Sequence, residues 1–535
     1  MFISLTAWLN KLNTLYLCSL LVLITSLCYL NTLNNGLFFD DEQFIYNNQA
    51  VKTFSLAGFF GQSLVSEGGK ISNYYRPILF LGYGMEYSLF GPVGFIYHLD
   101  SFLLHAAGGV VLFLLLKKLF AKKTLAFTTS LLFLIHPIQT EAVAYASGRG
   151  DPLSFFFSLL TLYFSLTKEK KHQILAWTFL VLALLSKEVT LMLPGLIFLV
   201  QLFSKKSLTK HTIYQSLKTT LPFAVITLIY FILRLTVLNF ANTLNFYQAT
   251  NIYSSSLFVR LNTFFHLFPS YLQLLIFPKT LFMERDSGIV IQTLPTVLSV
   301  ISFVGCLGAV GAAILLRKKY PILLFAIQWV VISFIPTSGI LPINGIFYEH
   351  FLYYPSVGFF LLAVYGFFLL YEHSSATIRL VLGVSLCAVI LILSIRTIIR
   401  NNDWHDPITF YRQLLSHVQS PRAYTNLAMT YADRGDNTDA ITAYQRAIAL
   451  SDTYPETHYD LGNSYAAMSQ VKQAESEYKK ALAIDPSFYL SYIKLYSLYK
   501  QTNDLPGLSW IEHELTNLGQ KNSQYLQLLQ QLKSH

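Results

Sequence analysis

Apolar and polar residues divide the chain into a long hydrophobic part and a polar C-terminal part. Up to about residue 400, apolar runs alternate with short polar connections, and several runs approach the roughly 20 residues that a helix needs to cross a bilayer. This pattern predicts an all-α, polytopic membrane helical bundle of about eleven spans. The predicted spans are 12–31, 98–116, 124–138, 152–167, 173–186, 189–203, 219–238, 293–316, 320–337, 355–371 and 378–398.

Two apolar segments need a separate interpretation. Residues 256–278 contain an arginine, a histidine and two prolines. Counting them as a span would place the basic run 317–319 on the opposite side from the other lysine clusters, so we expect a re-entrant or interfacial segment. The first apolar run continues through Tyr29-Leu30-Asn31 without a small-residue cleavage site. It is therefore predicted to be an uncleaved anchor.

The polar part contains an internal repeat. Residues 421–488 hold two copies of one pattern at the 34-residue period of tetratricopeptide repeats. Small residues at fixed positions let the two helices of each repeat approach closely, and Leu and Tyr fill the seam between them. A degenerate third unit and a polar tail are expected to cap the stack. The matched positions are Leu427, Ala428, Tyr431, Ala440, Tyr444 and Ala447, which recur as Leu461, Gly462, Tyr465, Ala474, Tyr478 and Ala481.

Composition agrees with this division. The 535 residues are 53% hydrophobic and 12% charged, against roughly 25% charged residues in soluble domains. The net charge of +10 comes from lysines clustered between apolar runs, which indicates topology rather than nucleic-acid binding. All four cysteines lie in apolar runs, so a disulfide framework is not expected. The predicted domains are a membrane domain at 1–400, a linker at 401–420, repeats at 421–522 and a tail at 523–535.

The lysine clusters also predict the orientation. If each cluster is cytoplasmic, the N-terminus is inside and eleven spans place the C-terminal repeats outside, in the periplasm of a bacterium or the lumen of a eukaryotic organelle. Inner loops are then short and basic, and outer loops are long and acidic. The first outer loop, at about 32–97, carries the pair Asp40-Asp41 directly after the first span.

The pair Asp40-Asp41 is the leading candidate for catalysis. Carboxylates close to a lipid boundary are costly to remove from water and are seldom placed there without a function. A carboxylate is also what general-base chemistry requires. The alternative is an acidic turn in a solvated loop.

Further candidates lie in the same outer loops. Arg76 offers a guanidinium fork for a phosphate, or an interfacial arginine that reaches lipid headgroups. His136 is expected to be a structural histidine rather than a metal ligand, and no metal site is predicted. Asp151-Pro152 has the chemistry of a helix N-cap followed by the first helical residue, so Asp151 is expected to be a helix cap in the structural interpretation. The remaining charged candidates are Glu141, Arg149, Asp151, Lys187, Glu188, Glu349 and His350.

These residues form ion pairs in the simplest interpretation, but their convergence on one side of the membrane suits an anionic, lipid-linked substrate. No Walker loop follows a strand and no GxSxG elbow occurs in the sequence. An enzyme of this composition would therefore take its activated donor from the membrane.

The ordered set of motifs resembles one family. The chain is similar to the transmembrane O-mannosyltransferases with tetratricopeptide repeats (the TMTC type), which are relatives of the protein O-mannosyltransferases, over nearly all of residues 10–500. No motif is decisive alone, but their order is specific. The motifs are Asp40-Asp41 with Asn47-Asn48, Tyr75-Arg76-Pro77, Tyr97-His98-Leu99 with Leu104-His105, His136-Pro137, Thr140-Glu141-Ala142-Val143, Gly148-Arg149-Gly150-Asp151, Ser186-Lys187-Glu188, Pro336-Thr337-Ser338, Glu349 and Leu352-Tyr353-Tyr354-Pro355-Ser356.

The resemblance implies a GT-C fold, a dolichyl- or undecaprenyl-phosphate sugar donor and Ser or Thr hydroxyls of proteins as acceptors, with no cofactor. Asp40 or Asp41 would be the base of an inverting displacement. Arg149 and Lys187, with Arg76, would hold the donor phosphate. His350 stands where the family usually has an arginine. Two other functions remain open, namely transfer to a glycan or lipid acceptor and a non-catalytic scaffold whose repeats recruit a partner.

Overall fold

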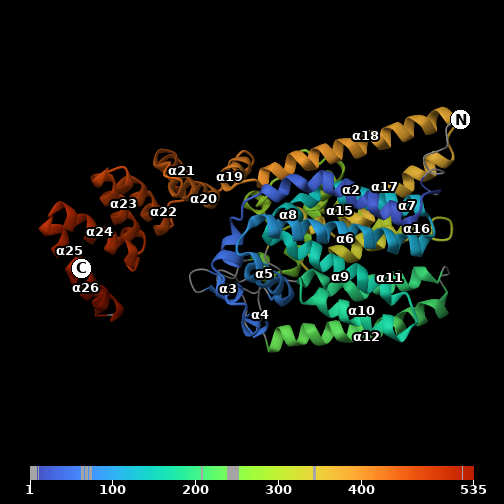
Figure 1. Cartoon of the computed structure of the whole chain (residues 1–535), viewed down its shortest axis with the longest axis horizontal. Helices are drawn as coiled ribbons and strands as arrows, with labels where there is room; N and C mark the ends of the chain where they lie inside the picture. Colours follow the sequence, from blue (N-terminus) through green and yellow to red (C-terminus); the bar gives the residue numbers. More distant parts are fainter. Residues whose placement is uncertain are drawn as a thin grey trace. The chain divides into compact units, whose positions relative to one another are not determined.

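The chain forms two compact units, Met1–Asp406 and Pro407–His535, in a computed structural model. Unit 1 contains the predicted membrane bundle and unit 2 the predicted repeats (Figure 1). Lys206, residues 239–251 and 341–344, and parts of the predicted first outer loop lie outside the described residues. The structure describes residues 9, 11–61, 65–66, 70–71, 75–205, 209–237, 252–340, 345–520 and 522–534.

A helix forms at each predicted span, but the predicted number of membrane crossings is not confirmed. Six helices in the described part of unit 1 are long and apolar enough to cross a membrane. Others, such as α7 and α16, have 13 and 14 residues, fewer than the roughly 20 of a full span. The helices are α2 (Thr14–Tyr29), α6 (Gly94–Phe120), α7 (Lys123–Ile135), α9 (Gly150–Ser165), α10 (Lys170–Leu184), α11 (Leu193–Ser204), α12 (Lys210–Thr236), α15 (Val297–Leu315), α16 (Pro321–Phe334), α17 (Pro355–Glu372) and α18 (Ala376–Asn401).

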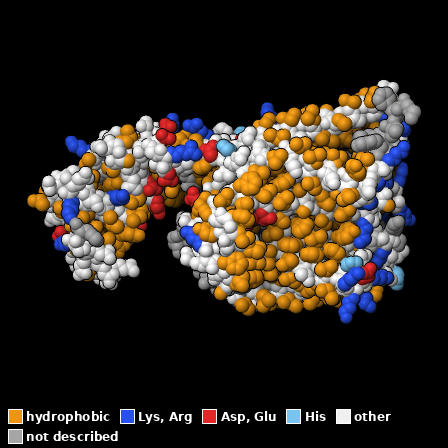
Figure 2. All heavy atoms as spheres, viewed as in Figure 1, with side chains coloured by type: hydrophobic (Ala, Val, Ile, Leu, Met, Phe, Trp, Pro, Cys, Tyr) orange, Lys and Arg blue, Asp and Glu red, His pale blue; other side chains and the backbone are white. Residues whose placement is uncertain are grey.

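The core of unit 1 is built by Leu, Phe and Ile side chains of α2, α6, α7, α9, α11, α16 and α17. α12 and α18 lie on opposite sides of the bundle (Figure 1). Hydrophobic side chains cover the face of unit 1 seen in Figure 2, and Lys and Arg gather at one end of it. Two of the lysines, Lys117 and Lys123, contact Thr14 and Leu12 at the start of α2. An apolar surface over a helical bundle is typical of a protein that has lipid as its solvent. The predicted class of helical membrane protein is confirmed, whereas its orientation stays a prediction.

The segment predicted to be re-entrant or interfacial is a continuous helix. It is α14 (Leu257–Ile276), which follows α13 (Ile252–Ser255) and packs against α15. Pro269 lies inside it. Its re-entrant or interfacial position in the membrane stays a prediction.

The predicted first outer loop is mostly helical. A small apolar core, which includes Ile45, Tyr83 and Tyr97, joins it to α6 and to residue Ala146. Its two short strands are the exception to the all-α class among the described residues, and they pair antiparallel. The elements are η1 (Leu30–Asn34), η2 (Glu42–Tyr46), α3 (Gln49–Lys52), α4 (Leu56–Gly61), β1 (Val65–Ser66), β2 (Lys70–Ile71) and α5 (Pro77–Phe90).

Short helical turns connect the remaining helices of unit 1. They place most of the charged candidates in compact, hydrogen-bonded backbone instead of extended loops. The turns are η3 (Pro137–Gln139), α8 (Thr140–Ala144), η4 (Ala146–Arg149), η5 (Glu188–Met192), η6 (Arg285–Gly288), η7 (Glu349–Leu352) and η8 (Asn402–Trp404).

Unit 2 is a stack of helix pairs, as the repeat predicts. Gly462 shows why small residues recur, since a Cβ there would lie 2.6 Å from Cε1 of Tyr478. The predicted linker contains a helix, α19, and the predicted polar tail forms α26, which packs against α25. The helices are α19 (Pro407–Leu415), α20 (Pro421–Asp433), α21 (Asn437–Leu450), α22 (Pro455–Ala467), α23 (Val471–Ile484), α24 (Tyr489–Thr502), α25 (Leu505–Gly519) and α26 (Gln524–Ser534).

Candidate active site

Asp41 is buried against Ser147. Its Oδ1 accepts hydrogen bonds from the Ser147 amide at 2.7 Å and from the Ser147 hydroxyl, and its Oδ2 accepts one from the Phe38 amide at 3.3 Å. The residue is 1% exposed. Burial raises the pKa of this carboxyl from 3.8 to about 7, although the hydrogen bonds from Ser147 and Phe38 act to lower it. Both carboxylate oxygens are thus held in place by the protein.

Asp40 differs from its neighbour because it is only half-buried. Its amide donates to the Tyr145 hydroxyl at 3.1 Å. The preceding residue, Phe39, has a φ of 61° and packs against Tyr145 with ring centroids 6.3 Å apart. A positive φ in a bulky residue is strained and persists only where surrounding contacts enforce it. The fold therefore leaves Asp40 half-buried and encloses Asp41.

The segment from Ser147 to Asp151 connects the acidic pair to two predicted cations. Ser147 holds Asp41 at one end, and at the other end Asp151 accepts a hydrogen bond from Lys187 Nζ at 2.7 Å. The two ends are four positions apart in helical backbone, so their backbones lie roughly 6–8 Å apart. Between them, a Cβ on Gly150 would lie 3.5 Å from Lys187 Cδ and 3.9 Å from Arg76 Nη1. The segment brings together Asp41, Arg76, Asp151 and Lys187.

The close packing of this segment depends on Gly148. A Cβ at this position would lie 2.6 Å from the Glu141 carbonyl oxygen and 3.2 Å from Ala142 Cα. Both atoms belong to the backbone of α8, which cannot move aside as a flexible side chain would. Gly148 therefore lets η4 lie directly against α8.

Arg76 and Lys187, two of the three predicted phosphate-binding cations, are held in ion pairs. Arg76 makes a fork with Glu188, with Nε–Oε2 and Nη2–Oε1 distances of 3.0 and 2.7 Å. Lys187 pairs with Asp151, which lies in the first turn of α9 instead of at the expected cap. The side chains of Arg76 and Lys187 are 11% and 13% exposed. Both cations are therefore fixed close to the surface and close to each other.

Arg149 is enclosed by other groups. Its Nη1 lies 2.7 Å from a Glu86 carboxylate oxygen and 3.2 Å from an Asp100 oxygen, its Nη2 donates to the Tyr97 carbonyl, and its Nε donates to Ser101. Only 1% of the side chain is exposed. The two carboxylates, the Tyr97 carbonyl and the Ser101 hydroxyl together occupy all three guanidinium nitrogens that a phosphate could contact. The geometry therefore does not support the predicted role of Arg149 in binding the donor.

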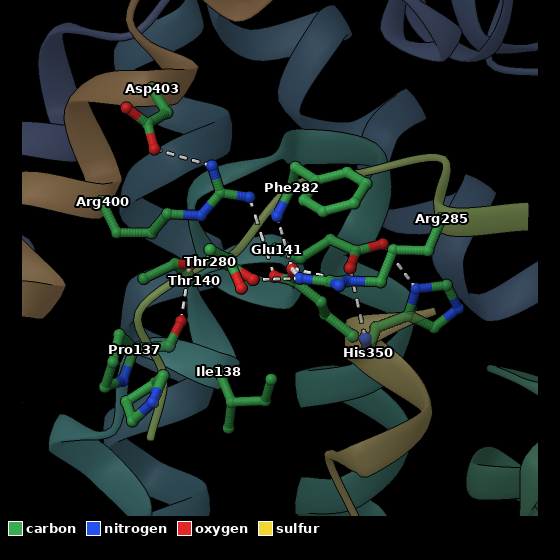
Figure 3. A network of polar contacts seen from close by, with 12 residues as sticks. Pro137, Ile138, Thr140, Glu141, Thr280, Phe282, Arg285, His350, Arg400 and Asp403 are labelled. Atoms are coloured by element: carbon green, nitrogen blue, oxygen red, sulfur yellow. Dashed lines mark hydrogen bonds and ion pairs between the residues drawn. The ribbon is translucent and has the colours of Figure 1, made fainter. Parts of the chain in front are cut away.

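A second network lies around Glu141 (Figure 3). His350 Nδ1 lies 2.6 Å from Glu141 Oε1, and the His350 amide donates to Oε2 at 3.2 Å. Burial raises the pKa of Glu141, but the charges of His350 and Arg400 outweigh burial and hold it below its usual range. Glu141 and His350 therefore pair with each other and do not join Lys187 and Arg76.

Glu349 belongs to the same network and lies between two arginines. Its Oε1 accepts hydrogen bonds from the Phe282 amide at 2.6 Å and from Arg285 Nη2 at 3.0 Å, and its Oε2 lies 3.6 Å from Arg400 Nη2. Arg400 also pairs with Asp403 at 2.7 Å (Figure 3). The Glu349 side chain is fully buried, and burial raises its pKa. This network ties η7 to the end of α18.

His136 has a structural role. It ends α7, where its Nδ1 accepts from the Ile138 amide and its Nε2 donates to the Leu275 carbonyl, both at 3.2 Å. Across the residues that the structure describes, no group of three or more His, Cys, Asp or Glu side chains is placed to hold a metal ion.

Several residues of the site are not among those predicted from the sequence. Glu86 gave a usable signal, since it is the only charged residue in the apolar helix α5. Ser147 directly precedes the motif Gly148-Arg149-Gly150-Asp151. Tyr145 and Trp404 gave none, because their rings stack at 5.0 Å although they lie far apart in the sequence.

Comparisons with known proteins give a consistent result. The chain is 26% identical over 518 residues to a mouse protein named protein O-mannosyl-transferase TMTC3, covering 88% of this chain and 55% of that protein. Its human counterpart gives the same identity and coverage over 511 residues. A Caenorhabditis elegans protein named protein O-mannosyl-transferase F38B6.6 is 27% identical over 470 residues, covering 82% of this chain and 63% of that protein.

The chain resembles the TMTC-type protein O-mannosyl-transferases. The resemblance predicted from the order of the motifs is thereby confirmed. The chain spans little more than half the length of the TMTC3 relatives. Residues 428–469 match the family described as TPR repeat and residues 455–488 the family described as tetratricopeptide repeat, which confirms the predicted repeats of this TMTC-like chain.

Proposed function

We propose that the chain is a GT-C-type membrane glycosyltransferase. In this proposal it moves a hexose, with mannose as the first choice, from a polyprenyl-phosphate donor to a Ser or Thr hydroxyl of a protein. The names of the TMTC3 and TMTC4 relatives support this activity. The observation that carries the proposal is the segment from Ser147 to Asp151, which holds Asp41 at one end and Lys187 at the other.

Asp40 acts as the general base in this proposal. A base has to be ionised and within reach of the acceptor hydroxyl. Asp40 is half-buried, whereas Asp41 is only 1% exposed. With a pKa of about 7, about half of the Asp41 carboxyls also keep a proton at neutral pH. Asp41 then fixes the loop that presents Asp40.

The reaction is a single displacement. The acceptor oxygen attacks the anomeric carbon from the side opposite the phosphate, and its proton passes to Asp40. The bond between the anomeric carbon and the phosphate oxygen breaks, and the polyprenyl phosphate leaves with the electron pair. The configuration of the sugar is therefore inverted. Lys187 and Arg76 stabilise the charge that develops on the departing phosphate, and the step requires no cofactor.

The proposed orientation places the N-terminus in the cytoplasm, and the site and the repeats outside it. Figure 2 supports this through the Lys and Arg that gather at one end of unit 1, where Lys117 and Lys123 contact the start of α2, because basic residues are enriched on the cytoplasmic side. The repeats of unit 2 would contact the acceptor protein, as repeat stacks offer extended binding surfaces.

A reconstituted transfer assay tests this function. The full chain in liposomes would receive dolichyl- or undecaprenyl-phosphate-linked mannose or glucose, together with an unmodified Ser/Thr-rich protein, a free glycan or a lipid as acceptor. We expect hexose on the protein, with inverted configuration, and loss of transfer in Asp40→Asn. Glu42→Gln, which changes an exposed neighbouring acid, is the matched control.

The other outcomes are equally informative. Transfer only to the glycan or the lipid would overturn the proposed acceptor. A folded chain that transfers hexose from none of the donors would overturn the enzymatic function and favour a scaffold.

A further inference from the structure

The end of α18 is joined to the chain segment that leads to the acidic pair. Asn401 is fully buried, and its Nδ2 donates to the Cys28 carbonyl at 2.8 Å and to Asn31 Oδ1 at 2.9 Å. Asn31 Nδ2 donates in return to the Ile398 carbonyl at 2.9 Å. These two amides therefore connect the start of the first outer loop to the last turn of α18.

The connection continues beyond these amides. The Gly36 amide donates to the His405 carbonyl at 2.9 Å. The rings of Trp404 and Tyr145 stack with centroids 5.0 Å apart and an interplanar angle of 19°. The Tyr145 hydroxyl in turn accepts the hydrogen bond from the Asp40 amide. Residues 398–405 thus contact both the start of the loop and the residue that orients Asp40.

We propose that residues 398–405, named here the α18 clamp, position Asp40 for catalysis through the stack of Trp404 on Tyr145. Trp404 is a positioning residue, since it reaches the acid only through Tyr145. The proposal rests on the function proposed for Asp40 above. It adds that the last residues of unit 1 in the sequence help to position this acid.

The strained backbone of Phe39 makes this positioning necessary. Because its φ of 61° is unfavourable, the turn before Asp40 would relax without contacts that enforce it. Tyr145 supplies two such contacts, one through its ring and one through its hydroxyl. Trp404, which is 1% exposed, stacks on the Tyr145 ring. Removing Trp404 would free the Tyr145 ring and, with it, the conformation that presents Asp40.

Arg400 and Asp403 hold the clamp itself. Arg400 Nη1 pairs with Asp403 at 2.7 Å, and its guanidinium lies 5.8 Å from the centre of the Trp404 ring. Arg400 also faces Glu349 at 3.6 Å. Arg400 therefore links Trp404 to the network around Glu349, which holds the Trp404 ring in place if Tyr145 moves.

Hydrogen–deuterium exchange tests the clamp without any assumption about the reaction. We expect Trp404→Ala to accelerate exchange in the peptide that covers residues 36–46 by about tenfold, because the local opening becomes easier. Trp404→Phe keeps a ring for the stack and should retain slow exchange. Trp177→Ala, which removes a 38% exposed ring from α10, is the matched control. Unchanged exchange in Trp404→Ala would overturn the proposal.

Kinetics test the catalytic consequence. Trp404→Ala should lower kcat per folded molecule roughly ten- to a hundredfold, because small displacements of a reacting group cost that much. The KM for the donor should stay the same, since Lys187 and Arg76 are held by other contacts. Tyr145→Phe, which keeps the ring but lacks the hydroxyl, should lower kcat in the same way, and Trp404→Phe should restore it.

The two measurements separate the possible failures. Accelerated exchange with unchanged kcat would show a purely structural contact and overturn the positioning role. A wild-type chain that transfers no hexose would overturn the function proposed above. The exchange measurement would still decide whether Trp404 holds the acidic loop.

Discussion

Lys187 and Asp151 form an ion pair of 2.7 Å about one helical turn from the serine that holds Asp41. The Asp151 side chain is 4% exposed and that of Lys187 13%. An ammonium group on a flexible stem can exchange a carboxylate for a phosphate with little rearrangement. In the proposed reaction, this ion pair would hold the Lys187 ammonium in place until a donor phosphate replaces Asp151 as its partner.

Substitutions of this pair separate stability from activity. Lys187→Gln leaves the Asp151 carboxylate buried and unpaired, so we expect a loss of about 3–5 kcal/mol in stability and about a hundredfold loss of kcat. The double variant Lys187→Gln with Asp151→Asn should regain the stability but not the activity. Thermal unfolding in detergent and the transfer assay measure the two effects. Activity that returns together with stability would contradict a role of Lys187 at the phosphate.

Because Asp41 is buried, we expect the stability of the folded chain to depend on pH. Its pKa is about 7 in the folded chain and 3.8 as the ordinary value, so the folded state binds a proton more tightly. Its contribution is fully present below about pH 4 and is lost as the pH rises through 7, which corresponds to about 4 kcal/mol in total. Asp41→Asn cannot ionise and should remove this slope. Thermal unfolding from about pH 5 to about pH 8 measures it.

Asp40→Asn provides the comparison for this experiment. Asp40 is half-buried, so its substitution should leave most of the slope in place while it abolishes transfer. If both variants kept the wild-type slope, the buried Asp41 carboxyl would not be its source.

Arg149 is predicted to act on stability and not on donor binding. Arg149→Gln leaves Glu86 and Asp100 close together without their cation, so we expect a loss of about 3–5 kcal/mol. The added substitution Glu86→Gln should recover part of it. The KM for the donor, measured on the folded fraction, should stay the same. A raised KM for the donor in the double variant, despite its restored stability, would show that Arg149 contributes to binding the donor phosphate.

Two neighbouring glycines should respond differently to alanine. A Cβ at Gly148 meets the backbone of α8 at 2.6 Å, so Gly148→Ala should lower the unfolding temperature and the activity together. A Cβ at Gly150 meets only side chains, at 3.5 Å or more. The Gly150→Ala variant should therefore fold normally. It should alter the KM for the donor, because the added methyl group would contact Lys187 and Arg76. Equal unfolding temperatures for the two variants would contradict this packing.

Some of the fold follows directly from local patterns. Apolar runs locate the helices of unit 1, because each run needs only its own length and composition to form a helix. The same runs do not reveal how many cross the membrane, since α7 and α16 are shorter than a bilayer and depend on their neighbours. The repeats are readable because positions such as Gly462 are required by contacts within one repeat. The strands β1 and β2 have two residues each and are too short to leave a pattern.

The site is harder to predict because its side chains pair with residues that are distant in the sequence. Asp40 and Asp41 look equivalent in the sequence, and they are distinguished by burial and by the hydrogen bonds that Asp41 accepts from Ser147 and Phe38. Lys187 and Arg76 are recognisable as cations near a membrane surface, but so is Arg149. The partners Glu86 and Asp100, which occupy Arg149, lie on other helices at no fixed spacing from it.

The position of the unit boundary has a practical consequence for anyone who divides the chain for expression. The shift in composition suggests a cut at residue 400, whereas unit 1 continues to Asp406. A fragment that stops at 400 would lack Asn401, Trp404 and His405, and with them the contacts to Asn31, Tyr145 and Gly36. Its inactivity would be mistaken for proof that the repeats are needed for catalysis, when the defect would lie within the membrane unit. Ending the fragment at Asp406 avoids that confusion.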